Sequence, residues 1–216
     1  MNSYGCVCAL LLLPVLSEAQ AAIALDRTRV VYNADEKAVT LSISNENRQL
    51  PYLAQAWLTD AQGEKVASPL VVLPPLQRVD PGEKSQIKLQ QLAAAANLPQ
   101  DRETLFYFNL REIPPRSEKA NTLQIALQTT IKLFWRPRAI VVSDATAAPW
   151  QQQLLLVQSG AHYRVKNPTP YYITLVDAQP AQGKPTIADF EPVMVAPYGE
   201  VPLGGTVSGL GREPIL

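Results

Sequence analysis

The residues that could carry acid–base, nucleophilic or metal chemistry are few in this chain of 216 residues. It has one histidine, His162, which lacks the motif context of the serine and carboxylate partners that a catalytic triad needs. Its two cysteines, Cys6 and Cys8, lie near the N-terminus, so no Cys/His set remains downstream to build a typical zinc site. The Gly-Lys pair at 183–184 precedes a proline, so it is not a phosphate-binding loop. The sequence therefore predicts neither an enzyme nor a bound cofactor or metal, and His162 is interpreted as a surface or strand residue.

The composition is that of a folded, neutral protein rather than a nucleic-acid binder. Lys+Arg and Asp+Glu both number 19, and no basic cluster is longer than two residues, so the basic face that nucleic acid requires is missing. Hydrophobic residues make up 47% and charged residues 18%, which is ample material for a core. Proline accounts for 19 of the 216 residues, which is well above its usual share of about 5%. This favours short strands and turns over long helices.

The N-terminal segment predicts a secretory signal peptide over residues 1–21. Its apolar run at 7–16 is shorter than the roughly 20 residues that span a bilayer, and Ala19-Gln20-Ala21 is a site of the kind that signal peptidases cut. A buried N-terminal strand or an anchor is the alternative. Cleavage would make Ala22 the first residue and remove both cysteines, so the exported chain would fold without disulfides. No later segment approaches a membrane span, which predicts no membrane insertion.

The elements that must position any site are short β-strands. Period-two alternation recurs between turn signals such as Asp80-Pro81-Gly82, and this predicts an all-β sandwich protein. A connector at 137–149 divides the chain into a first unit at 22–136 and a second at 150–216. One helical turn is expected at 93–96. The expected strands are 39–43, 52–59, 71–73, 87–89, 105–113 (apolar on both faces, hence central) and 123–134 in the first unit, and 154–157, 163–165, 171–176 and 193–195 in the second.

A long stretch at 98–114 reads LPQDRETLFYFNLREIP and resembles the signature of the periplasmic pilus-assembly chaperones. The match continues through PRSEKAN and LQIALQTTIKLF, and includes LDRTR at 25–29, PYLAQAW at 51–57 and NPTPYY at 167–172. The resemblance implies two Ig-like β-sandwich domains at an angle, with a subunit-binding cleft between them. It implies a periplasmic protein that lends a strand to pilus (fimbrial) subunits, by donor-strand complementation, and passes them to an outer-membrane usher without using a nucleotide.

Within this resemblance, Leu123, Ile125 and Leu127 match the positions that fill the open groove of a subunit. A subunit that lacks a strand exposes a sheet edge and an apolar groove, and a lent strand supplies hydrogen bonds and a side chain at every second residue. The alternative from alternation alone is that these three residues pack into the protein's own core while the intervening residues face water.

Arg29 and Lys132 match the cleft pair that, in the resembling family, binds the C-terminal carboxylate of the subunit. Two cations on one carboxylate would give charge-assisted hydrogen bonds and would fix the register of the bound strand. The alternative is two solvated cations on strands. Simple alternation places Lys132 on the opposite face from Leu127, which a β-bulge or a twist of the strand would reconcile.

Glu103 and Arg136 match an interdomain salt-bridge network of the family, whose third member is an aspartate. Gly209 stands about where that aspartate is expected, so an ordinary pair of surface charges is the alternative. The second unit, 150–216, is shorter than the roughly 100 residues of a complete Ig-like domain, and we expect it to be an incomplete sandwich. The other hypothesis for the whole chain is an exported β-sandwich that is itself a structural or adhesive surface subunit.

Overall fold

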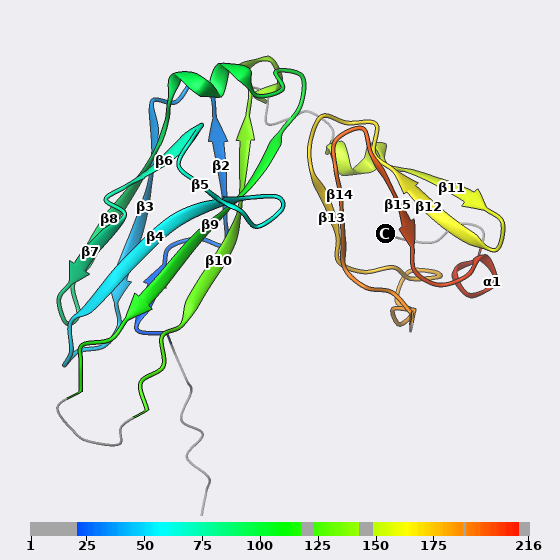
Figure 1. Ribbon diagram of the computed structural model, residues 1–216. Coiled ribbons are helices and arrows are strands. Elements are labelled where there is room, and N and C mark those ends of the chain that lie inside the picture. The colour runs from blue at the N-terminus through cyan, green and yellow to red at the C-terminus, as the bar shows by residue number, and fades with distance from the viewer. Residues whose placement is uncertain (1–20, 118–122, 143–148, 188, 212–216) are drawn as a thin grey trace, which may run out of the picture.

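The structure is a computed structural model that describes residues 21–117, 123–142, 149–187 and 189–211. The predicted leader, apart from Ala21, lies outside the described residues. Figure 1 shows two β units, one of blue to green strands and one of yellow to red strands, which meet at one end. The described residues form fifteen strands and one short α-helix, so the expectation of an all-β protein is confirmed. No helix among them is long and apolar enough to cross a membrane.

The first unit is a sandwich of two sheets. One sheet has the order β1-β3-β8-β6, and the other has the order β2-β10-β9-β4-β5, with β7 also paired to β4. The strands of the first sheet are β1 (Ile23–Leu25), β3 (Ala38–Asn45), β8 (Lys84–Gln91) and β6 (Leu70–Leu73). Those of the second are β2 (Arg29–Asn33), β10 (Gln128–Arg136), β9 (Thr104–Ile113), β4 (Tyr52–Asp60), β5 (Lys65–Val66) and β7 (Leu76–Val79).

The core of the first unit lies between these sheets because their inner faces carry the alternating apolar residues. Tyr32, Phe108 and Trp135 are its largest fully buried side chains. Strand β9 pairs with β10 on one edge and with β4 on the other, which confirms that 105–113 is a central strand. The turn after β7 needs a glycine, since Gly82 has a φ of 71°, in the left-handed region. The expected helical turn is a 3-10 helix, η1 (Ala93–Asn97).

The second unit has a smaller core and two small sheets. They are β11 (Leu155–Ser159), β12 (His162–Lys166) and β15 (Glu200–Leu203) in one, and β13 (Ile173–Leu175) with β14 (Val193–Val195) in the other. Short helices η2 (Arg138–Ile140) and η3 (Trp150–Gln153) precede them, and α1 (Val207–Leu210) follows β15. The strand at β15 and the helix α1 were not predicted, because Pro202 and Gly209 disfavour those elements locally.

The prediction of one continuous strand from Leu123 to Phe134 is wrong for its first part. Residues 123–127 are not in a strand, and β10 begins at Gln128. The last hydrogen bond between this segment and β9 is made by Leu127, the residue before β10, whose carbonyl accepts from the amide of Glu112 at 3.0 Å. Beyond Ile113 come two prolines, which have no N–H to donate, so β9 offers residues 123–126 no continuing ladder.

Candidate functional site

The structure brings Arg29 and Lys132 side by side. Strand β2 runs parallel to β10, and Lys132 is the register partner of Arg29, the first residue of β2. In both strands the neighbouring residues, Val30 and Leu133, point into the core, so the two cations project from the outer face. Among the described residues, neither cation has an acidic partner within 4.0 Å. Their charges are therefore free to meet an anion.

These two cations line a cleft of about 680 Å³ that both units enclose. The first unit contributes Thr28, Arg29, Thr130, Ile131, Lys132 and Phe134, and the second contributes Trp150, Gln151, Tyr172, Ile173, Thr174 and Val176. Across the cleft, the ammonium of Lys132 donates to the hydroxyl of Thr174 at 3.2 Å. A cleft that presents two cations and the hydroxyl of Thr174 suits a small anionic group such as a carboxylate.

The edge of β10 next to this cleft is open. On one side β10 pairs with β9 from Gln128 to Trp135, and on the other side β2 covers only Lys132 to Arg136. The N–H and C=O groups on the β2 side of Gln128–Ile131 therefore meet no partner strand among the described residues. Such an edge is a template for an added strand.

Leu123, Ile125 and Leu127 extend this open edge and are exposed, with 85%, 64% and 41% of their surface accessible. The alternative that they pack into the protein's own core is therefore wrong. The core-facing residues of β10 begin only at Ile131 and continue with Leu133. No bulge is needed to place the lysine, because the register of β10 with β9 is unbroken from Gln128 to Trp135.

Glu103 and Arg136 form a buried ion pair at the junction of the two units. Both Nε and Nη2 of Arg136 donate to Oε1 of Glu103, at 3.0 and 2.8 Å. Only 3% of the Glu103 side chain and 12% of the Arg136 side chain are accessible, so the alternative of a surface pair is wrong. The other oxygen, Oε2, accepts from the backbone amide of Tyr172 in the second unit, at 2.8 Å.

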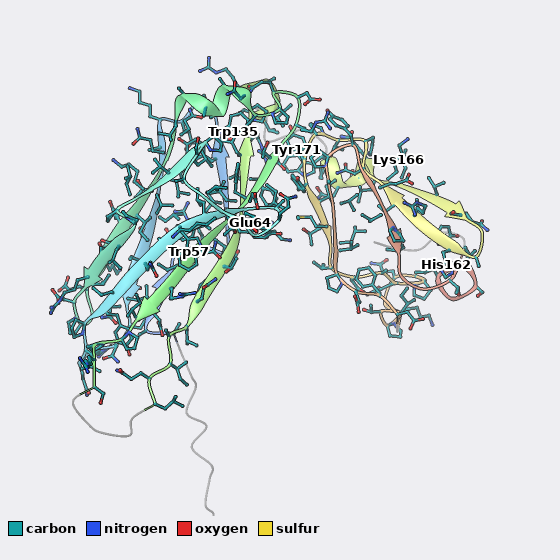
Figure 2. All side chains as sticks on the ribbon, in the orientation of Figure 1. Trp57, Glu64, Trp135, His162, Lys166 and Tyr171 are labelled. Atoms are coloured by element: carbon teal, nitrogen blue, oxygen red, sulfur yellow. The ribbon has the colours of Figure 1, made fainter. Side chains whose placement is uncertain are left out.

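Two aromatic rings of the second unit lie beside Arg136. The guanidinium lies 4.9 Å from the ring centroid of Tyr171 and 5.6 Å from that of Trp150, and these two rings stack at 4.5 Å. Figure 2 shows Tyr171 where the two units meet. Gly209 lies away from this pair in α1, where its amide bonds to Thr206. A guanidinium over aromatic faces gains cation–π attraction without a second carboxylate.

One face of β10 thus carries a row of contacts to the second unit. Arg136 meets Tyr171, the ring of Phe134 lies 5.5 Å from that of Tyr172, and Lys132 meets Thr174. Burial raises the pKa of the Tyr172 phenol, so this ring stays neutral beside Glu103. Lys132 and the Glu103–Arg136 pair are therefore held against the second unit by contacts between β10 and residues 171–174.

Both units of the chain match known protein families. Residues 22–141 match the family model of the pili and flagellar-assembly chaperone, PapD N-terminal domain, and residues 149–214 match that of the pili assembly chaperone PapD, C-terminal domain. The chain belongs to the PapD-like family of pilus-assembly chaperones. These are not enzymes, and the hypothesis of a structural or adhesive surface subunit is set aside.

Individual relatives are similar over most of their length. The chain is 52% identical to the chaperone protein PapD of Escherichia coli over 212 residues, which are 94% of this chain and 88% of PapD. It is 46% identical to a probable fimbrial chaperone, YfcS, of Escherichia coli K12, over 90% of this chain and 78% of YfcS. Among solved structures, the periplasmic chaperone SfaE matches with a TM-score of 0.67 at 30% identity, over 89% of this chain and 97% of SfaE. The Salmonella enterica SafA pilin–SafB chaperone complex contains a chain that matches with a TM-score of 0.69 at 28% identity, over 90% of this chain and 95% of that chain.

Several residues of the cleft were not found from the sequence. Thr174 and Trp150 lie outside the stretches that matched the family and Phe134 ends one of them; all three acquire their roles from contacts with segments distant in the chain. The available signal was that the NPTPYY stretch, which ends at Tyr172, matched the family. His162 lies exposed on β12, with Nδ1 2.8 Å from the carbonyl of Gly205, as expected for a surface or strand residue.

Proposed function

We propose that this chaperone captures pilus subunits by donor-strand complementation at the open edge of β10 and delivers them to an outer-membrane usher. The observation that carries the proposal is the position of Arg29 and Lys132. They stand where β2 begins and the uncovered part of β10 ends. A subunit strand that continues the line of β2 along residues 123–131 would end with its carboxylate at these cations. It would run parallel to β10, as β2 does.

The exposed apolar residues supply the second half of the interaction. In the free protein, Leu123, Ile125 and Leu127 stand in water, which is costly for side chains of this size. In a complex they would fill the groove that a subunit leaves open when it lacks a strand. The carboxylate anchor at Lys132 would fix which groove position each side chain enters, because a strand held at one end has one register.

The junction would hold the two halves of the cleft at a fixed separation. The buried pair of Glu103 and Arg136 joins β10 to the amide of Tyr172, two residues before Thr174. We assign this pair a structural role in shaping the cleft rather than a contact with the subunit.

Chaperones of this family act in the periplasm. We infer that residues 1–21 are a signal peptide cleaved after Ala21, and that the chaperone domain spans 22–136, the linker 137–149 and the second domain 150–216. The A-x-A site at Ala19–Ala21 supports the cleavage position.

The test uses a synthetic peptide with the sequence of the last strand of a pilus subunit, made both as the free acid and as the C-terminal amide. The free acid should bind the wild-type chaperone at least tenfold more tightly than the amide in a fluorescence anisotropy titration. Arg29→Ala and Lys132→Ala should each abolish that preference and lose about 2–5 kcal/mol of affinity, the cost of truncating a buried charged contact.

The matched control is Lys166→Ala, which removes an exposed cation from β12 in the second unit and should bind like the wild type. Equal binding of acid and amide, or wild-type affinity in both cleft variants, would show that the carboxylate is not held by this pair.

A further inference from the structure

A buried acid on the inner face of β9 has no counter-charge. Along this face Phe106, Phe108 and Leu110 enter the core, and the next residue of the same parity is Glu112, only 6% accessible. No cationic side chain of the described residues lies within 4.0 Å of it. Buried carboxylates are ordinarily paired with a charge or neutralised. A cation close to Glu112 would therefore stabilise its buried charge, and no described side chain supplies one.

Among the described residues, the hydrogen-bond partner of this carboxylate is a backbone amide at the start of β1. Oε2 of Glu112 accepts from the backbone amide of Ile23 at 2.8 Å. Ile23 is the first residue of β1, and this bond joins β1 in one sheet to β9 in the other. Strand β1 has three residues and, among the described strands, pairs with β3.

The backbone nitrogen of Ala22 lies next to this bond. Successive backbone nitrogens are at most about 3.7 Å apart, so the nitrogen of Ala22 is within roughly 6.5 Å of Oε2. Ala22 is itself buried, and its carbonyl accepts from the amide of Glu46 at 2.7 Å. While the leader is attached, the nitrogen of Ala22 belongs to a neutral peptide group.

We propose that cleavage of the leader creates the missing cation. Hydrolysis of the peptide bond between Ala21 and Ala22 consumes one water and leaves a carboxylate on Ala21 and an ammonium on Ala22. That α-ammonium then pairs with Glu112 inside the end of the sandwich. This inference rests on the cleavage site given above and is independent of how subunits are bound.

The ion pair would complete the end of the domain from which the lent strand departs. The amide of Glu112 donates to the carbonyl of Leu127, the residue before β10. The new terminus, the buried acid and the start of the open edge are thus joined through Glu112. Export processing would stabilise the subunit-binding edge only in the mature chaperone.

The first measurement needs no substitution. In the full mature chain with a free Ala22 terminus, the α-amine should react with an amine-acylating reagent at least tenfold more slowly when folded than when unfolded in urea. The site of reaction is located by peptide mass mapping. Equal rates in the two states would overturn the proposal.

The second measurement compares thermal unfolding of the mature chain with that of a chain carrying Gly-Ser before Ala22. The extension should lower the midpoint of the first unit by about 4 °C or more. In a Glu112→Gln background the same extension should have little effect, whereas in the control background Glu46→Gln it should have its full effect. Equal shifts with and without Glu112 would overturn the ion pair.

The intact mass of the chain purified from periplasm separates this inference from the proposed function. Cleavage at another position would refute the ion pair at Ala22 and leave the peptide-binding results for Arg29 and Lys132 untouched. If the wild-type chaperone failed to bind the peptide while its α-amine was protected from acylation, the proposed subunit site would be refuted and the ion pair at Ala22 would stand.

Discussion

Arg29 and Lys132 differ in what holds them before a subunit arrives. The ammonium of Lys132 is fixed by the hydroxyl of Thr174 in the second unit, at 3.2 Å. Arg29 has no ion pair among the described residues and is positioned by its place at the start of β2. Ordering a lysine in advance reduces the side-chain entropy lost when its ligand binds. Under the proposed function, Thr174 therefore serves as a positioning residue for Lys132.

The Thr174→Val variant tests this role, since it removes the hydroxyl and keeps the shape. We expect peptide affinity to fall about 2- to 10-fold, the effect of one ordinary hydrogen bond. The same substitution in a Lys132→Ala background should change affinity little, because the group that Thr174 holds is gone. Thr28→Val, which alters another cleft threonine, is the control. A loss of the same size with and without Lys132 would assign Thr174 a direct contact instead.

At the scale of the elements, alternation predicted the strands better than it predicted where they end. The patterns at 39–43, 52–59 and 105–113 correspond to β3, β4 and β9. The alternating pattern at 123–134 starts five residues before β10, which begins at Gln128. Alternation reports only the period of one strand, whereas the start of β10 depends on how far its neighbours β9 and β2 extend beside it. The residues that this pattern assigned wrongly, 123–127, are those that extend the open edge of β10.

The two faces of residues 123–128 should respond differently to charge. Ile125→Asp and Leu127→Asp should block complex formation with subunits, because a carboxylate would enter an apolar groove. Gln124→Asp and Gln128→Asp should bind nearly normally, since those side chains would face away from it. Co-purification from periplasm measures the outcome.

The unfolding midpoint of each free variant is the control. The exposure of Ile125 and Leu127 leads us to expect unchanged midpoints. Midpoints that fall only for the Ile125 and Leu127 variants would mean that these residues support the chaperone's own fold.

At the scale of the whole molecule, the junction could be predicted only in part. The family resemblance singled out Glu103 and Arg136, but their burial depends on Trp150 and Tyr171, which lie distant in the sequence. No local pattern reports that an arginine will be covered by two rings from another unit. For the same reason, Gly209 at the position where the resemblance implied an aspartate did not reveal that aromatic rings lie beside Arg136.

Breaking the junction pair should cost more than removing it. Arg136→Met leaves Glu103 buried without a counter-charge, its Oε2 still bonded to the amide of Tyr172, and we expect a loss of about 3–5 kcal/mol in the free energy of unfolding. The double variant Glu103→Gln with Arg136→Met should recover most of that loss. Urea denaturation measures both. A double variant as unstable as Arg136→Met alone would mean that the loss of stability comes from the missing contacts between the Arg136 guanidinium and the aromatic rings. It would not come from the buried charge of Glu103.

The last prediction concerns which unit opens first. Among the described residues, the core of the first unit has 21 buried side chains and that of the second has seven. Because burial of apolar surface is the main stabilising contribution, the smaller core makes the second unit the less stable of the two. The junction holds the units together, but its contacts lie at one end and leave β11 and β12 unsupported by the first unit.

We therefore expect amide hydrogens beyond residue 149 to exchange sooner than those of β3, β4 and β9, and limited proteolysis to leave a resistant N-terminal fragment. Arg136→Met should widen the difference, because it removes the support that the first unit lends. Equal protection in both units would mean that the whole molecule unfolds as one cooperative body despite its unequal cores.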